Sequence, residues 1–233
     1  MRDRAKAGQA IHSNRSAQSA LWECKRVATA VLHFPFPHNW QAEVLAARPA
    51  ILPARHFVYP RDAEEVERGA LEVMVRPGDG AQPFLATCAL GFRDPVAPTG
   101  LWSTPNPDAM CAISGGYAYI IDTSAPEQFT MIPYRPVLQV LSAGSQGLML
   151  FIGHRSILAW GAQRQTWESA KLSDEGITIR GFANGALHGV GWEMMSDSEI
   201  PFALDLRTGQ PAAGTARELP QITSCSGRER SGA

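Results

Sequence analysis

The chain has 233 residues, of which 45% are apolar, and these values suit one large globular domain or a domain with an extension. Its 21 Lys/Arg residues nearly balance its 22 Asp/Glu residues, so it lacks the basic excess of a nucleic-acid-binding protein. The four cysteines form no CxxC pair and are few for a disulfide scaffold. No apolar run reaches the length of a membrane-spanning helix. We therefore expect a soluble, cytoplasmic protein that binds no metal, no cofactor, no membrane and no nucleic acid.

Residues 1–60 are predicted to be an N-terminal extension. They carry eight Lys/Arg against three Asp/Glu residues, and the first twenty have too few large apolar side chains to offset the entropy of ordering. Apolar spacings of three and four predict a helix over Ala17–Leu32, the alternative being a segment that docks only weakly. Five prolines punctuate His33–Pro60 and leave room for one short helix at Asn39–Ala47, with Asn39 as its N-cap.

Residues 61–212 are predicted to form a β-rich domain, followed by a flexible tail at 213–233. A short helix over Asp62–Arg68 precedes the first alternating strand. Gly115-Gly116 predicts a hairpin between two apolar strands, whereas Pro95–Pro107 is predicted to be a long irregular loop carrying Trp102. The expected strands of this half are Leu71–Val75, Phe84–Phe92, Met110–Ser114, Tyr117–Asp122 and Val137–Leu141.

The second half contains the clearest strand pattern, because no proline occurs between Pro136 and Pro201 and proline is excluded from central strands. Asn184-Gly185 is a strong signal for a type I′ turn. The expected strands are Leu148–Ile152, Ser156–Trp160, Thr166–Ala170, Ile177–Phe182, Ala186–Trp192 and Phe202–Leu206. This close spacing predicts an all-β protein with antiparallel sheets, arranged as an incomplete propeller, a sandwich or an open barrel.

Two stretches within residues 147–209 share a loose pattern of glycine, apolar strand, turn and tryptophan. This pattern is found in two motifs: Leu204-Asp205-Leu206-Arg207-Thr208-Gly209, and Ile157–Trp160 followed by Trp167. These motifs resemble degenerate blades of the quinoprotein-like (PQQ-type) β-propellers. A closed propeller needs at least four blades of about forty residues, more than this domain holds, so the resemblance implies an incomplete one. The stretch from Leu71 to Gly209 also resembles a widespread kind of bacterial protein ending in "GW…PF.LDL.TG", which implies no particular activity.

No catalytic motif is complete in this sequence. The nearest approach to a nucleophile elbow, Gly144-Ser145-Gln146-Gly147, lacks the required spacing and is interpreted as a turn. Two prolines separate His33 from His38 and forbid the helix that would pair them as metal ligands. Cys88 and Cys111 lie in apolar strands and are expected in the core.

Four residues are candidate binding residues. Trp102 is chosen because functional residues concentrate on long loops, the alternative being that it caps the core. Trp192, like Trp160 and Trp167, is expected either to fill the core between the sheets or to form an aromatic rim for a sugar, a peptide or a protein partner. Glu193 follows it beside a polar loop, and His154 lies in an exposed turn.

These residues leave three functions open, the third being a structural subunit that lacks any small-molecule site. The first is a non-enzymatic binding module that recognises a protein partner. The alternative is a small hydrolase or lyase, which requires a histidine and a carboxylate to meet in a cleft. The candidate histidines are His154 and His188, and the candidate carboxylates are Glu193, Asp174 and Asp205.

Overall fold

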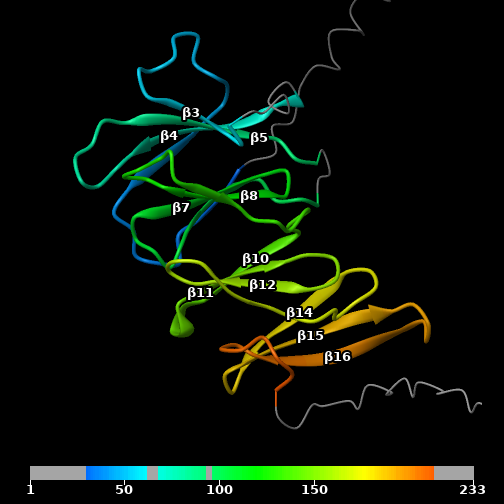
Figure 1. Ribbon diagram of the computed structural model, residues 1–233. Helices are drawn as coiled ribbons and strands as arrows, with labels where there is room; N and C mark the ends of the chain where they lie inside the picture. The colour runs from blue at the N-terminus through cyan, green and yellow to red at the C-terminus, as the bar shows by residue number, and fades with distance from the viewer. Residues whose placement is uncertain (1–29, 62–67, 93–95, 213–233) are drawn as a thin grey trace, which may run out of the picture.

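The computed structural model describes residues 30–61, 68–92 and 96–212, and within these ranges the protein is built from strands. They contain sixteen strands and one short 3-10 helix, and no α-helix. The strands form four separate sheets that stack face to face along the molecule, and none closes into a barrel (Figure 1). The all-β prediction is confirmed.

The four sheets are numbered I to IV in the order in which they stack. Sheet I contains β2 (Gln41–Leu45), β4 (Ala70–Arg76), β5 (Phe84–Ala89) and β3 (His56–Tyr59). Sheet II contains β1 (Val31–His33), β6 (Gly100–Ser103), β7 (Ala109–Ser114), β8 (Tyr117–Asp122) and β9 (Phe129–Met131). Sheet III contains β10 (Gln139–Ala143), β11 (Leu148–Ile152), β12 (Ile157–Trp160) and β13 (Gln165–Glu168), with the 3-10 helix η2 (Gly144–Gln146) between its first two strands. Sheet IV contains β14 (Ile177–Ala183), β15 (Ala186–Glu193) and β16 (Ser198–Asp205).

Neighbouring strands are antiparallel except at two places, where β1 pairs with β6 and β3 with β5 in parallel. Both exceptions involve strands from the N-terminal sixty residues, which add to edges of sheets formed by later parts of the chain. Asn184 and Gly185 both have positive φ angles between β14 and β15, as the predicted type I′ turn requires. The hairpin predicted at Gly115-Gly116 is also present, between β7 and β8.

Three apolar cores fill the spaces between the four sheets, because alternate residues of each strand point to opposite faces. Between sheets I and II lie side chains such as Val73, Phe84 and Tyr119. Between sheets II and III lie Cys111 and Phe151, among others. The third core, between sheets III and IV, includes Leu150, Ile157, Trp167, Leu187 and Leu204. The central sheets are therefore buried on both faces, which explains their nearly continuous apolar sequences.

Aromatic side chains with a polar tip connect one sheet to the next. The Tyr59 hydroxyl on β3 donates a hydrogen bond of 2.8 Å to the Pro126 carbonyl oxygen in the β8–β9 turn. The Trp167 indole on β13 donates a bond of 2.8 Å to the carbonyl oxygen of Leu206, just beyond β16. Each ring thus adds apolar contact while its single donor is satisfied by the backbone of the adjacent sheet.

The short helix predicted at Asn39–Ala47 is wrong. Residues Gln41–Leu45 are β2, which pairs with β4 over five residues from Gln41 opposite Arg76 to Leu45 opposite Glu72. The side chain of Asn39 does not cap a helix but donates a bond of 2.8 Å to Asp108 in the β6–β7 loop of sheet II. Helix propensity is a weak preference, and the backbone pairing offered by β4 overrides it.

The irregular loop predicted at Pro95–Pro107 is also wrong in part, because Gly100–Ser103 is β6, paired with β7 and β1. The boundary drawn at residue 60 does not separate an extension from the body either, since β1, β2 and β3 belong to sheets I and II. The helix predicted at Ala17–Leu32 ends in what is β1, and residues 17–29 lie outside the described residues. So do residues 62–67 of the short helix predicted at Asp62–Arg68, and the tail 213–233.

Candidate functional site

A groove with a volume of about 340 Å³ lies on sheet IV, which ends the stack. It is lined by Glu175, Gly176, Ile177, Thr178, Val190, Gly191, Trp192 and Glu199. The inner face of sheet IV packs on sheet III through Leu187 and Leu204, so strand alternation places Thr178, Val190 and Trp192 on the outer face. Among the described residues, no further sheet packs against that outer face (Figure 1).

Ser173 in the loop between β13 and β14 holds the backbone of Trp192. Its buried hydroxyl oxygen accepts a bond of 2.8 Å from the Trp192 amide and donates one of 2.5 Å to the Gly176 carbonyl oxygen. A Cβ atom on Gly191 would lie 2.0 Å from the Leu172 carbonyl oxygen, so only glycine allows this approach of the loop. The tight contact fixes the strand that carries the indole.

Carboxylates surround the groove. Glu175 and Glu199 line it directly, and Glu199 forms an ion pair of 3.5 Å with Arg180, both side chains being mostly exposed. Asp174 accepts a hydrogen bond from Lys171 and another of 2.9 Å from the Met194 amide. The Lys171 bond in particular, together with that amide, lowers the pKa of Asp174.

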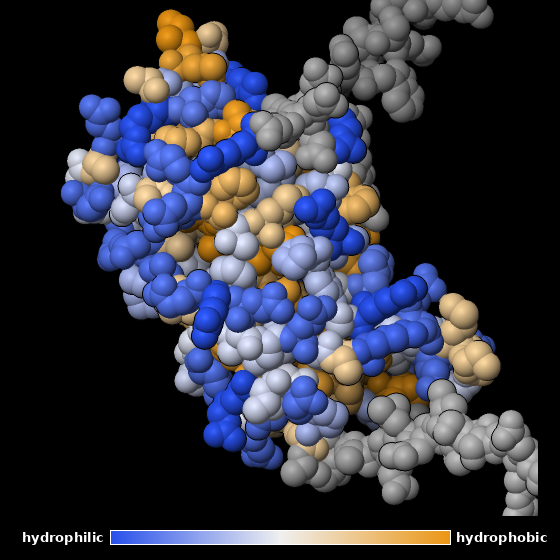
Figure 2. Space-filling view, viewed as in Figure 1, coloured by the Kyte–Doolittle hydropathy of each residue, from blue (hydrophilic) through white to orange (hydrophobic). Residues whose placement is uncertain are grey.

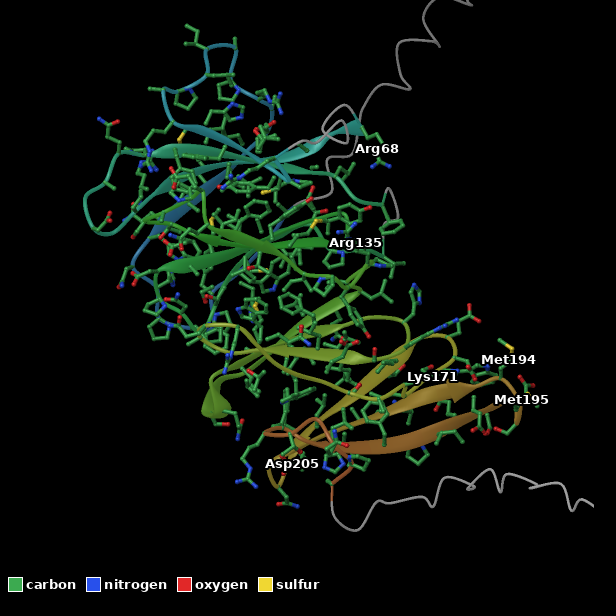
Figure 3. The ribbon with its side chains drawn as sticks, viewed as in Figure 1. Arg68, Arg135, Lys171, Met194, Met195 and Asp205 are labelled. Atoms are coloured by element: carbon green, nitrogen blue, oxygen red, sulfur yellow. The ribbon has the colours of Figure 1, made fainter. Side chains whose placement is uncertain are left out.

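Two exposed methionines form the tip of the β15–β16 hairpin beside the groove. Met194 is 66% and Met195 is 94% exposed, and both project from the end of sheet IV opposite Asp205 (Figure 3). Figure 2 shows the tip as a pale-orange projection among blue, hydrophilic atoms. Methionine is flexible and polarisable, so such a tip adapts to the shape of a contacting surface. The groove and its tip together combine apolar contact with negative charge.

Of the four predicted binding residues, three lie at this end of the molecule. Trp192 lines the groove, and Glu193, next to it, accepts a bond of 2.5 Å from Ser196 within the hairpin turn. His154 is exposed in the β11–β12 turn, and its carbonyl oxygen accepts a bond from the Gly176 amide, which places it near the groove. Its ring is not among the groove-lining groups of the described chain.

Trp102 lies elsewhere. It is on β6, is only 5% exposed, and packs in the core between sheets II and III. Its selection as a contact residue depends on the loop predicted around it, and the strand that replaces this loop turns the ring inward. Trp160 and Trp167 are core residues, which is one of the two positions predicted for these tryptophans, whereas Trp192 lines a surface groove.

The contribution of the β13–β14 loop is not predicted from the sequence. The strands expected from the sequence leave Ser173 and Glu175 between Ala170 and Ile177, and Glu199 between Trp192 and Phe202, with no binding role for any of them. In the structure, Glu199 lies on β16 opposite Trp192. Only the pairing register shows that Glu199 and Trp192 are neighbours, because six residues lie between them along the chain.

The structure brings no predicted catalytic pair together. Among the described residues, no hydrogen bond or ion pair joins the ring of His154 or His188 to a carboxylate. Asp205 instead holds the turn after β16, accepting bonds from the amides of Arg207 and Thr208, and the Arg207 amide in particular lowers its pKa. This carboxylate therefore stabilises a turn and bonds no histidine ring among the described residues.

One histidine does belong to a buried polar chain, on sheet I. His56 Nε2 lies 2.9 Å from the Thr87 hydroxyl, which donates a bond of 2.6 Å to Glu72. Glu72 also accepts a bond of 2.8 Å from Arg48. The Thr87 proton is directed to Glu72, so His56 must donate rather than act as a base toward the hydroxyl. Thr87 is also completely buried. The cluster therefore satisfies a buried carboxyl group and offers no accessible nucleophile.

The described part of the chain contains no group of three or more His, Cys, Asp or Glu side chains placed to bind a metal ion. It also contains no helix with the length and apolar character needed to cross a bilayer. Comparison with models of known protein families, with curated proteins and with solved structures finds no match to this chain. The resemblance of residues 147–209 to quinoprotein-like blades therefore stays a prediction.

Proposed function

We propose that the protein is a non-enzymatic interaction module that binds a protein partner on the outer face of sheet IV. The observation that supports this most directly is the position of Trp192 in the groove. A partly exposed indole on a rigid strand offers a large contact area at a small cost in conformational entropy, and tryptophan is enriched at the energetic centres of interfaces.

The position of sheet IV at the end of the stack supports the same proposal. Sheets II and III have both faces covered, whereas the Thr178–Val190–Trp192 face meets no described sheet. The nearby Met194 and Met195 add apolar surface that contributes nothing to the cores between the sheets. Exposed apolar side chains beside a groove with a polar rim are typical of a recognition site.

The test compares the native chain with Trp192→Ala in quantitative pull-downs from its natural host. Proteins bound through the groove are expected to fall at least about tenfold in the variant, because truncating a central interface tryptophan costs about 2 kcal/mol or more. Ile51→Ala is the matched control, since Ile51 is an exposed apolar residue in the β2–β3 loop of sheet I. Equal retention by the native chain and Trp192→Ala, with both variants folded by circular dichroism, would rule out this site.

A further inference from the structure

The chemistry of the groove on sheet IV specifies its partner more closely, and this step rests on the function proposed above. We infer that the groove takes a segment that carries lysine or arginine next to an apolar side chain, and that this segment lies across the face of the sheet. Three features support the inference: the blocked edges of sheet IV, the charge of the groove, and the Trp192 indole that lines it.

The edges of sheet IV are unsuited to pairing with an added strand. β14 has a bulge between Ile179 and Gly181, and a bulge twists an edge away from a straight partner. On β16, the Ala203 carbonyl oxygen and the Asp205 amide already pair with the Gln210–Ala212 segment. The next residue with the same backbone orientation is Pro201, which has no amide proton to donate. A partner therefore meets side chains on the face rather than the backbone at an edge.

Negative charge dominates sheet IV and the loop before it. Residues 171–205 hold six Asp/Glu against Lys171 and Arg180, a net charge of −4. Both titratable side chains that line the groove, Glu175 and Glu199, are acidic. The nearby Arg180–Glu199 pair is exposed and 3.5 Å long, and pairs of this kind are weak, so an incoming cation replaces Arg180 at small cost.

The indole of Trp192 adds a second means of recognising a cation. Glu199 lies directly opposite Trp192 in the β15–β16 register, so a carboxylate and an aromatic ring occupy neighbouring positions on one face. A lysine or arginine between them gains a cation–π contact and an ion pair together. Val190 and the methionines of the hairpin tip provide apolar contact for the residue beside that cation.

Fluorescence anisotropy with three labelled nonapeptides tests the inference on the full chain. The probes are repeats of Gly-Lys-Leu, of Gly-Glu-Leu and of Gly-Lys-Ser. We expect the Lys-Leu peptide to bind tightest, the Lys-Ser peptide more weakly and the Glu-Leu peptide not at all. The affinity of the Lys-Leu peptide should also fall as ionic strength rises, because the Debye length shortens from about 10 Å at 0.1 M to about 3 Å at 1 M salt.

Removing an acidic side chain and removing a basic one should change the peptide affinity in opposite directions, which distinguishes specific recognition from non-specific adsorption. Glu175→Gln and Glu199→Gln should each weaken the Lys-Leu peptide by about twofold to fivefold, as expected for the loss of an exposed ion pair. Arg180→Gln should strengthen binding of the Lys-Leu peptide, because the cation that competes for Glu199 is removed. Glu43→Gln on β2 is the control and should leave the affinity unchanged. Equal binding of the Glu-Leu peptide, or a loss of affinity in Arg180→Gln, would overturn the inference.

The two proposals fail in different ways. If pull-downs depend on Trp192 but the retained protein is insensitive to Glu175→Gln and Glu199→Gln, the interaction site stands and the basic partner is wrong. If Trp192→Ala changes neither the pull-down nor peptide binding, both proposals are wrong.

Discussion

Gly209 shows how one residue can join two sheets. It has a φ angle of +69° and lies under the Trp167 ring, so a Cβ atom there would come within 2.4 Å of the indole. The same indole donates its hydrogen bond to Leu206, three residues earlier. The turn after β16 is therefore shaped to receive a side chain from sheet III, and any side chain at residue 209 interferes.

Replacing Gly209 by alanine should destabilise the protein by about 2–4 kcal/mol, which combines overpacking with a strained left-handed backbone. Gly80→Ala is the matched control. Gly80 has a φ angle of +80° and no atom within 4 Å of the place that a Cβ atom would take, so only the backbone cost of about 1–2 kcal/mol should appear. Urea unfolding of both variants measures the difference, and equal losses of stability would show that the indole contact is unimportant.

Cys88 and Cys111 are buried in two different cores, and burial raises the pKa of both thiols well above the ordinary value. The thiolate is the reactive form, so neither should react with N-ethylmaleimide at neutral pH in the folded protein. Peptide mass spectrometry after brief labelling, with and without urea, is the measurement. Labelling of either residue without denaturant would show that its core opens readily.

The β13–β14 loop is the element that shapes the candidate site. Ser173 bonds the backbone on both sides of the groove, and Asp174 holds the amide of Met194 at its tip. The loop thus fixes both the strand that bears Trp192 and the start of the hairpin turn. A rigid support of this kind lets a surface aromatic residue bind without first being ordered.

Ser173→Ala should reduce stability by about 1–3 kcal/mol, because the Trp192 amide and the Gly176 carbonyl group lose a buried partner. Hydrogen exchange of the β15 amides nearest Trp192 should accelerate, while those of β11 stay protected. Ser145→Ala, in the exposed 3-10 helix η2, provides a control that removes a surface hydroxyl group. Unchanged exchange at β15 would contradict a supporting role for the loop.

At the scale of the whole molecule, the described body is a stack in which each sheet packs on its neighbours. Sheet IV has its core with sheet III and none with sheet I or sheet II. Stability in such a linear arrangement is approximately a sum over neighbouring interfaces. A terminal sheet with a single packed face is therefore expected to open at lower free energy than the central ones.

Leu187→Ala, which removes a fully buried side chain from the sheet III–IV core, should cost about 2–5 kcal/mol. Native-state hydrogen exchange should show the loss in sheet IV and leave sheet I protected. Leu101→Ala is the matched substitution in the sheet I–II core, and its effect should have the opposite distribution. Uniform loss of protection in both variants would mean that the four sheets unfold as one unit.

Much of the strand pattern is predictable from local sequence. In the proline-free half, the predicted strand boundaries lie within a few residues of the observed ones. This is because sheets III and IV are built from consecutive antiparallel strands with short turns. Prediction fails where pairing is not local. β1 and β6 pair across almost seventy residues, and β2 becomes a strand because β4 lies beside it. No local pattern contains that information.

The candidate site divides in the same way. Trp192 and Glu193 can be identified from the sequence, because an aromatic residue before a polar turn is a local pattern. Trp102 looks equally exposed by that reasoning, yet β6 carries it into the core. Glu72 alternates with apolar residues like a solvent-facing position, but it is buried, where it accepts hydrogen bonds from Arg48 and Thr87. The burial of a side chain depends on which other element covers its face of the sheet. The local sequence does not contain this information.

The amino-acid sequence alone determines that this protein is all-β, because alternation, turn residues and the absence of proline act within a few residues of one another. Tertiary structure alone decides that the strands form four stacked sheets, because that arrangement depends on contacts between residues far apart in the chain. It also decides which of the candidate tryptophans lines a surface groove. Trp102 and Trp192 both lie on strands, but a sheet covers the first and no described sheet covers the second.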